Sequence, residues 1–349
     1  MEHHSLFQRV VRWQRQHGRQ HLPWQGTHDP YRVWLSEVML QQTQVATVLD
    51  YFPRFLARFP DVAALAAAPL DDVLALWSGL GYYSRARNLH RCAQAVAARP
   101  DGRFPHTAAE LAELPGIGPS TAAAIAAFCF GERVSILDGN VKRVLSRVLT
   151  FEGDLASARE LRTLWDRVQA LVEADASHAD MVAWTQGLMD LGAGLCARSR
   201  PDCAACPLAR DCQAHAQGRE AEFPRRTRKL VRRHESWYLL ALWRPDGAVA
   251  LVQRPARGIW SGLFAPPVFA NEADLLAALA AAGIRATSID WPPARGHALT
   301  HRELMLHLAH VRVRASDDWP DARWASPADW AGMGLPAPVR SWLNELASA

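Results

Sequence analysis

Residues 114–127 read LPGIGPSTAAAIAA, in which a glycine-containing turn precedes an alanine-rich run. Gly116 and Gly118 permit a tight backbone turn and let amide N–H groups approach a phosphate, to which the next helix adds its positive dipole end. With a helix on each side, the turn would form a helix–hairpin–helix, which holds a DNA backbone without reading its sequence. A plain turn between two helices is the alternative interpretation of this pattern.

The residues around this stretch, 1–215, follow helical patterns. Asp29 and Pro30 form a start signal for helical structure in 31–59, and Thr107 with Glu110 matches a capping box. One apolar helical face is made by Val141, Val144, Leu145, Val148 and Leu149. Few segments alternate in the manner of strands, so we expect an all-α region.

The pattern changes to that of strands after residue 236. WYLLALW (237–243), a turn at Arg244–Gly247 and AVALVQR (248–254) predict a β-hairpin. The remaining signals predict a helix over 272–282 closed by Gly283, a strand over 303–313 and a short helix over Val339–Leu346. This part of the chain is therefore expected to form a small α+β domain.

A basic segment lies between these two regions. From Arg219 to Arg233 there are seven Lys/Arg and two acidic residues, a local charge of +5 with Pro224 in the middle. Such a composition is typical of a solvated connection, so residues 216–234 are predicted to be an exposed linker.

Length and composition limit the class of protein. At about 150 residues per domain, 349 residues suggest two or three domains. Hydrophobic residues make up 49% and charged residues 21%, which excludes disorder over most of the chain. The N-terminus lacks a secretory apolar region, and we expect no membrane span. The net charge of +4 permits a nucleic-acid partner without requiring one.

Four of the six cysteines fall within one short segment. Their spacing is Cys196-x6-Cys203-x2-Cys206-x5-Cys212. Four thiolates in one loop can bind Zn²⁺ tetrahedrally or hold an iron–sulfur cluster, and the number of ligands does not distinguish the two. The single x2 pair with wide outer spacings is less typical of common zinc sites, which favours the cluster.

Two carboxylates are candidates for acid and anion chemistry. On a helix, the neighbours of Glu37 would include Val33, Trp34 and Leu40, and this apolar setting would raise its pKa and suit a general acid. Asp138 precedes the helix of the 141–149 face and could simply cap it. Together they would form the pair that breaks a glycosidic bond through a cationic transition state.

These motifs resemble, in their order, the adenine DNA glycosylases, the MutY family of the helix–hairpin–helix glycosylase superfamily. The matching segments are VWLSEVMLQQTQV (33–45), LPGIGPSTAAAI (114–125), LDGNVKRV (137–144) and the four-cysteine loop. The resemblance implies a multidomain protein with an all-α helix–hairpin–helix glycosylase core, an iron–sulfur cluster loop and a C-terminal α+β Nudix-like domain. The implied domains are 1–28 with 138–215 (N-terminal helix and cluster domain), 29–137 (six-helix domain), 216–234 (linker) and 235–349 (8-oxoguanine recognition).

The resemblance also implies the reaction, the excision of adenine mispaired with 8-oxoguanine or guanine. Glu37 would protonate the flipped adenine at N7, and Asp138 would stabilise the oxocarbenium-like sugar. Trp24 and Gln186 would belong to the adenine pocket. One [4Fe–4S] cluster per chain would be held by Cys196, Cys203, Cys206 and Cys212.

Other residues would contact DNA by the same resemblance. Gln42 and Tyr82 would lie beside 8-oxoguanine in the distorted duplex, and Gly116 and Gly118 would contact the backbone. Ser120 stands where the related endonuclease III group carries a catalytic Lys, so no amine is available there for a Schiff base. Base removal without strand cleavage is therefore expected.

The C-terminal region departs from the patterns it resembles. Arg302-Glu303 is not followed by the glutamates of a Nudix box, so no pyrophosphatase activity is expected. Leu299-Thr300-His301 stands where the family has Phe-Ser-His, so Thr300 and His301 are the expected contacts to 8-oxoguanine. The lost aromatic side chain leaves the preference for 8-oxoguanine over guanine open.

The implied partner is double-stranded DNA with an A·8-oxoguanine or A·G mismatch. We expect a monomer without membrane contact, in the bacterial cytoplasm and associated with the nucleoid. Two other functions compete: a bifunctional glycosylase/lyase for oxidised pyrimidines, and a non-catalytic damage sensor with a Cys₄ metal module. Ser120 argues against the first, and the pair Glu37 and Asp138 argues against the second.

Overall fold

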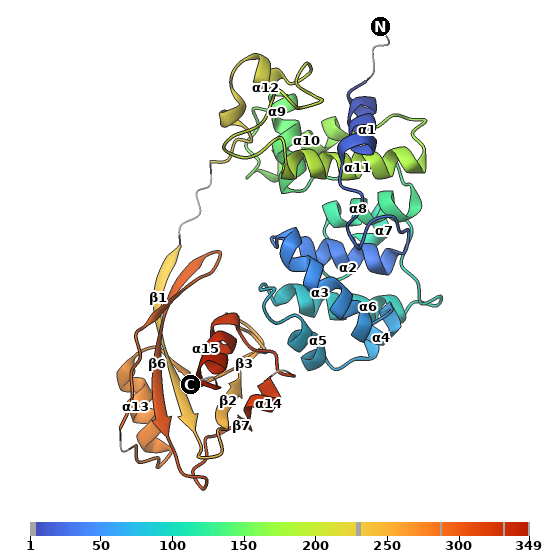
Figure 1. Ribbon diagram of the computed structural model, residues 1–349. Helices are drawn as coiled ribbons and strands as arrows, with labels where there is room; N and C mark the ends of the chain where they lie inside the picture. The colour runs from blue at the N-terminus through green and yellow to red at the C-terminus, as the bar shows by residue number, and fades with distance from the viewer. Residues whose placement is uncertain (1–4, 228–231, 287, 331, 348–349) are drawn as a thin grey trace. The chain divides into compact units, whose positions relative to one another are not determined.

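The fold was obtained as a computed structural model, which describes residues 5–227, 232–286, 288–330 and 332–347. The chain forms two compact units, Met1–Ala66 with Arg91–Lys229, and Ala67–His90 with Leu230–Ala349. Figure 1 labels the helices and strands of both units. In the described residues no helix is long and apolar enough to cross a membrane.

The elements before residue 230 are helical, and no strand precedes Arg233 in the described part of the chain, which confirms the all-α prediction. The helices are α1 Leu6–His17, α2 Pro30–Leu40, α3 Val45–Arg58, α4 Val62–Ala67, α5 Leu70–Leu76, α6 Ser84–Ala97, α7 Ala108–Leu111, α8 Pro119–Phe130, α9 Gly139–Val148, α10 Ala158–Gln169, α11 His178–Ala193, α12 Gln213–Ala216 and the 3₁₀ turn η1 Glu220–Glu222.

Helix α11 lies at the centre of the first unit, against α1, α8 and α9 (Figure 1). Its Trp184 is fully buried, stacks on Phe7 of α1 at 4.9 Å between ring centroids, and donates its ring N–H to Ser135. The predicted apolar face of α9 packs into the same core. Each large side chain buried here stabilises the fold by about 1.5–3 kcal/mol.

The start signal at Asp29 and Pro30 is confirmed, and two other local predictions are refined. Asp29 caps α2 by accepting from the N–H of Tyr31, with Pro30 in the first turn. The predicted helical segment 31–59 is broken at 41–44 into α2 and α3. At Thr107 the capping box is incomplete, because the Glu110 carboxylate accepts from the Thr107 hydroxyl and not from its backbone N–H.

Within the predicted exposed linker, 216–234, the residues up to 227 are ordered on the first unit, and most of them are exposed, in agreement with that prediction. Phe223 is buried, and Arg219 and Arg225 both pair with Glu152 and lie over the Phe223 ring. The N–H of Leu155 donates to the carbonyl of Arg225. An aromatic anchor and arginines with acidic partners therefore hold this segment in place. Residues 228–231 lie outside the described residues.

The second unit contains a mixed sheet of order β3-β2-β1-β6-β5, with β4 paired to β1 and β7 to β2. Strands β1 and β6 run parallel over eleven residues, and the other paired strands are antiparallel. The strands are β1 Arg233–Trp243, β2 Val249–Gln253, β3 Phe264–Ala265, β4 Val268–Phe269, β5 Arg295–Ala298, β6 Arg302–Arg312 and β7 Ala322–Ala325.

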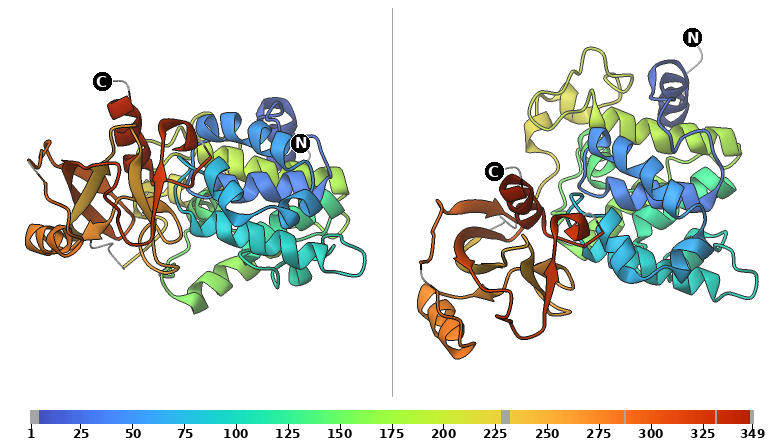
Figure 2. Two further views of the ribbon diagram at one scale, coloured as in Figure 1. Left: turned by 90° about the horizontal axis from the view of Figure 1, so that it is seen from below. Right: turned by 60° about the horizontal axis from the view of Figure 1, so that its bottom comes forward.

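Both faces of the sheet are covered, by α13 (Glu272–Ala281) and by α15 (Ala337–Ala347) (Figure 2). Leu240 packs with Leu275 of α13, whereas the neighbouring Leu239 lines a small void with Trp342 of α15. Because successive strand residues point to opposite faces, this double burial explains the continuous apolar run of β1. The predicted hairpin, the helix before Gly283, the 303–313 strand and the final helix are confirmed; a further short helix, α14, spans Pro327–Trp330.

The two units do not follow the boundaries of the predicted domains, and the first unit contains parts of both predicted helical domains. Residues 67–90, with α5 and the start of α6, group with the C-terminal sheet and not with the helical unit. Hydrogen bonds from Ser78 and Tyr83 to the carbonyl of Leu335 are part of this attachment. The four-part division of the chain stays a prediction.

Candidate active site and cysteine loop

A cavity of about 380 Å³ opens in the first unit, and three residues predicted from the sequence line it. These are Trp24, Glu37 of α2 and Gln186 of α11. Val33 and Leu40, the predicted apolar neighbours of Glu37, line it too. The cavity therefore combines a single carboxyl with four carboxamides, those of Gln14, Gln20, Gln25 and Gln186, and with apolar side chains, the composition of a small-molecule site.

Glu37 binds its proton more strongly than an exposed glutamate does. Burial, together with the negative charge of Asp138, raises the pKa of Glu37 to about 8. The upward direction of this pKa shift agrees with the expectation from the sequence, which rested on the apolar neighbours of Glu37 alone. A carboxyl in this state keeps its proton near neutral pH and can act as a general acid.

Asp138 is the N-cap of α9, which was the alternative interpretation of this residue from the sequence. Its side chain accepts from the N–H of Val141 at 2.7 Å, at the start of α9. Burial raises the pKa of Asp138, while the N–H groups of Val141 and Asn140 and the charge of Lys142 act in the opposite direction. Asp138 does not line the cavity, but its charge acts on Glu37, so the structure couples the two carboxylates electrostatically.

Gln186 is held by residues that the sequence analysis did not identify. Its Nε2 donates to Asp190 at 2.8 Å, and the same carboxylate accepts from the backbone N–H and the Nε of Arg19. Asp190 is buried. The i,i+4 spacing of Gln186 and Asp190 on a helix is a signal that could have indicated this pair.

Trp24 forms an apolar wall of the cavity. Its ring is 7% exposed and meets Phe52 of α3 edge to face, with 5.5 Å between centroids. Gln42, by contrast, is exposed in the turn between α2 and α3 with φ = 58°. This left-handed conformation is uncommon outside glycine and is often found at functional positions.

The glycine turn has the geometry that the hairpin requires. Gly116 has φ = 79°, a conformation that side chains disfavour, and Gly118 precedes α8 as its N-cap with Pro119 in the first turn. A Cβ added at Gly118 would meet nothing within 4 Å, so its backbone is open to a ligand. Ser120 accepts from the N–H of Leu137 at 3.3 Å and so ties the hairpin to the residue before Asp138.

In the second unit, Tyr82 and Thr300 are brought together. The Thr300 hydroxyl donates to the Tyr82 hydroxyl at 3.0 Å. Tyr82 is 45% exposed and has φ = 47°. The side chain of His301 is exposed, and its carbonyl accepts from the N–H of Arg233 at the start of β1.

The four predicted cysteine ligands surround one small void together with Glu220. Burial raises the pKa of Cys203 and of Cys206 to about 11, and neighbouring thiols and Glu220 add to the rise at Cys203. A bound cationic centre would reverse this by stabilising the thiolates. The donor set therefore fits an iron–sulfur cluster, and it equally fits a zinc ion.

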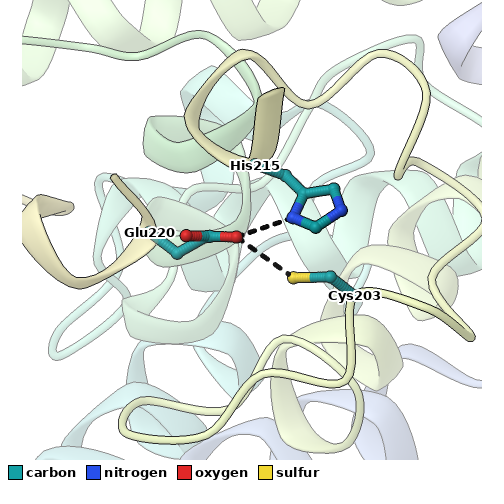
Figure 3. Close-up of side chains that lie close together, drawn as sticks. All are labelled: Cys203, His215 and Glu220. Atoms are coloured by element: carbon teal, nitrogen blue, oxygen red, sulfur yellow. Dashed lines mark hydrogen bonds and ion pairs between the residues drawn. The ribbon is translucent and has the colours of Figure 1, made fainter. Parts of the chain in front are cut away.

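A second group of donor atoms overlaps this site at Cys203. Glu220 accepts from the Nδ1 of His215 at 2.7 Å and from the Sγ of Cys203 at 3.6 Å, as Figure 3 shows. The three ligand atoms lie within 4.8 Å of one another. With four thiols converging on the neighbouring void, we interpret Glu220 and His215 as polar support for Cys203.

Arg147 of α9 organises the cysteine loop and was not identified from the sequence. Its buried guanidinium donates to the Sγ of Cys196 at 3.3 Å and to the carbonyls of Ala197, Arg198 and Glu220. The loop thus depends on a single cation for several of its backbone hydrogen bonds.

Fold and site together define the class, a helix–hairpin–helix DNA glycosylase. Residues 35–169 match the HhH-GPD superfamily of base excision DNA repair proteins, and residues 238–345 match the NUDIX domain. Among solved structures, a thermostable thymine-DNA glycosylase has a TM-score of 0.52 at 24% identity, covering 60% of this chain and 95% of its own. That likeness concerns the fold alone.

Curated relatives narrow the class to a family. An adenine DNA glycosylase of Buchnera aphidicola subsp. Baizongia pistaciae is 32% identical over 346 residues, covering 98% of this chain and 96% of the relative. The human adenine DNA glycosylase is 35% identical over 311 residues, covering 74% of this chain and 56% of the relative. The chain belongs to the adenine DNA glycosylase family, which confirms the resemblance and makes it an enzyme, a hydrolase of the DNA glycosylase class.

Proposed function

We propose that the protein excises adenine paired with 8-oxoguanine or guanine from duplex DNA, without cutting the strand. The observation that carries this proposal is Glu37, a carboxyl held protonated in a cavity beside Gln186 and under the influence of the Asp138 charge. An enzyme that acts on a base in a duplex must first extrude it, and this cavity would receive the extruded adenine.

Gln186 would select the base. A carboxylate accepts only, so the amide nitrogen faces Asp190 and the Oε1 of Gln186 remains an acceptor for the cavity. Such an acceptor suits the exocyclic amino group of adenine, whereas a base with a carbonyl at the same position would be repelled. Trp24 would pack on the base from the apolar wall.

The chemistry would proceed by protonation and departure of the base. Glu37 would give its proton to N7 of adenine, the C1′–N9 bond would break, and the electron pair would leave with N9. The charge of Asp138 would stabilise the cationic sugar until water attacks C1′ and gives a proton to the Glu37 carboxylate. The products would be free adenine and an abasic site.

Strand cleavage is not expected to follow. Ser120, whose hydroxyl accepts from the N–H of Leu137, offers no amine for a Schiff base with the sugar. Lys142 is an amine next to the site, and burial lowers its pKa. Borohydride trapping of a protein–DNA adduct at the rate of base release would favour the competing glycosylase/lyase.

The cysteine loop would hold one [4Fe–4S] cluster through Cys196, Cys203, Cys206 and Cys212. When bound, the cluster would order the loop and present its arginines to DNA phosphates, and it would take no part in glycosidic chemistry. A purified protein with broad absorbance at about 400 nm would support the cluster, and a colourless zinc protein would contradict it.

DNA would be held by the hairpin and read at the opposite strand by the second unit. The open backbone at Gly118 supports a phosphate contact. The proposed contacts to 8-oxoguanine are Tyr82, Thr300 and His301 of the second unit and, from the first unit, the exposed Gln42. The protein would act as a monomer at the bacterial nucleoid, and pyrophosphate hydrolysis by the Nudix-like region is not expected.

The test is single-turnover base release from A·8-oxoguanine and A·G duplexes. The native protein should yield abasic sites that break only after alkali treatment. Glu37→Gln should lower the rate by about 10²–10⁴-fold while DNA binding persists. Glu272→Gln, the same change at an exposed residue, is the control. Normal excision by Glu37→Gln would refute the mechanism.

A further inference from the structure

The loop that carries Tyr82 is attached by side-chain hydrogen bonds to the C-terminal part of the second unit. The carbonyl of Leu335 accepts two hydrogen bonds, from the Ser78 hydroxyl at 3.0 Å and from the Tyr83 hydroxyl at 2.8 Å. Leu335 is fully buried. A buried carbonyl with two side-chain donors from one loop fixes both ends of that loop relative to residue 335.

Arg340 of α15 strengthens this attachment. Its Nε donates to the Ser78 hydroxyl at 2.8 Å, its Nη1 to the carbonyl of Trp330 at 3.0 Å, and its Nη2 to the carbonyl of Met333 at 2.6 Å. The planar guanidinium can serve all of these acceptors at once, which a lysine ammonium on a flexible stem cannot reproduce. Arg340 therefore joins the end of α5 to the chain before α15.

Close packing accompanies the hydrogen bonds. A Cβ at Gly334 would lie 3.0 Å from the Cβ of Leu74, so the backbone there approaches α5 as closely as glycine permits. A second arginine, Arg87 of α6, donates to the carbonyl of Ser261 at 2.7 Å. Both sides of the Tyr82 loop are thus tied to the C-terminal region of the chain.

Tyr82 itself is exposed although its backbone is constrained. Its φ of 47° is a conformation that a non-glycine residue keeps only where its surroundings impose it. Arg85 lies over the ring at 5.4 Å and donates to the carbonyls of Leu80 and Gly81. An exposed aromatic ring on a constrained backbone loses little conformational freedom when it meets a ligand.

We propose that Arg340, with the Leu335 carbonyl, is a clamp by which the Nudix-like region positions the Tyr82 loop. The inference rests on the proposed function, because the position of Tyr82 has a consequence only if Tyr82 contacts the duplex. It assigns the C-terminal region a second role besides direct contact through Thr300, since it also sets the geometry of a loop from the matched glycosylase region. Arg340 is in this sense a positioning residue.

Two variants of the full-length protein remove the clamp. Arg340→Met keeps an unbranched apolar stem and removes the guanidinium donors, and Tyr83→Phe removes the hydroxyl that donates to Leu335 and accepts from the N–H of Gly79. The control is Arg295→Met, because Arg295 also ties α15, through both oxygens of Glu345, without touching the Tyr82 loop. Tyr83→Phe retains the apolar ring and serves as the milder variant if Arg340→Met folds poorly.

Amide hydrogen exchange without DNA measures the clamp itself. Residues 80–83 should exchange about tenfold faster in Arg340→Met and in Tyr83→Phe, and their exchange should be unchanged in Arg295→Met. Gly79 is left out of the comparison because its own N–H donates to the Tyr83 hydroxyl. In single-turnover excision, the preference for A·8-oxoguanine over A·G should fall by about tenfold in both variants, while Arg295→Met retains it.

Unchanged exchange in both variants would overturn the clamp, as would an equal increase in Arg295→Met. Faster exchange with an unchanged preference would overturn its role in recognition. If the native protein releases no adenine from either duplex, the proposed function fails, and the exchange comparison still decides whether the clamp exists.

Discussion

At the scale of single residues, Asp138 has two effects, one on helix α9 and one on the neighbouring acid Glu37. Asp138 caps α9 and at the same time raises the pKa of Glu37 by its charge. A capping aspartate that follows the buried residues 135–137 is fixed in position, so its charge acts on the neighbouring acid from a constant place.

Excision should depend on pH through Glu37. Because the acid must carry its proton, we expect a level rate near neutral pH and a tenfold loss per pH unit above about 8. A profile of single-turnover rates between pH 6 and pH 10 measures this. A rate that keeps rising past pH 9 would contradict a protonated Glu37.

Stability should follow the same titration. The folded protein holds the Glu37 proton more strongly than the unfolded chain, so the free energy of unfolding should decline as pH rises from about 4.5 to about 8. Glu37→Gln, which imitates the protonated form, should lack this decline. Urea unfolding of both proteins across this range, compared as a difference, tests the sign.

The two roles of Asp138 can be separated by substitution. Asp138→Asn keeps a capping oxygen but removes the charge, so stability should be retained while excision falls by about 10²-fold or more. Asp138→Ala should also lose about 0.5–2 kcal/mol of stability with the cap. Both should lower the pKa of Glu37, measurable by NMR titration. Full activity in Asp138→Asn would show that the charge is not needed.

At the scale of elements, α9 links the active site to the cysteine loop. Its first turn is capped by Asp138, and its last turn carries Arg147, which donates to Cys196 and to three loop carbonyls. The spacing of the cysteines predicts a metal or cluster loop, but it does not predict the arginine that organises it, because that residue is far away in sequence.

Arg147→Met should therefore impair the loop before it impairs the chemistry. Leaving these part-buried carbonyls without their charged donor should cost about 2 kcal/mol and lower the iron content and the absorbance of the proposed cluster at about 400 nm. Arg159→Met, on the exposed side of α10, should leave both unchanged. A full iron complement with native stability in Arg147→Met would count against this account.

At the scale of the whole molecule, the chain does not divide where its composition changes. The basic segment up to residue 227 is held on the first unit, and residues 67–90 belong to the unit of the C-terminal sheet. The sequence pattern predicted the change from helices to strands correctly. It does not predict which earlier helices pack with the C-terminal sheet.

A chain that ends at residue 229 should therefore be impaired within its own helical region. Ser78, Tyr83 and Leu74 would lose their partners around Leu335, so residues 67–90 should exchange amide hydrogens faster and the thermal midpoint should fall. Hydrogen exchange of the truncated and full-length proteins makes the comparison. Equal protection of residues 67–90 in both would contradict the division into units.

The sequence by itself determined the local structure and the candidate chemistry. The cap at Asp29, the apolar face of α9, the hairpin glycines and the cysteine spacing depend on residues within a few positions of one another, whose preferences act without the rest of the chain. The motifs, taken in their order, are specific enough to indicate the family.

Only the tertiary structure decided which distant residues meet. It placed Trp24, Glu37 and Gln186 around one cavity, paired β1 in parallel with β6 and attached the Tyr82 loop to Arg340. Each of these contacts closes a long loop of chain, so its free energy depends on the packing of the intervening elements and not on local preference. Local patterns carry no record of that packing. They therefore indicated the residues of the site and the apolar neighbours of Glu37, but not the charge of Asp138 on Glu37 or the hydrogen bonds that hold Gln186.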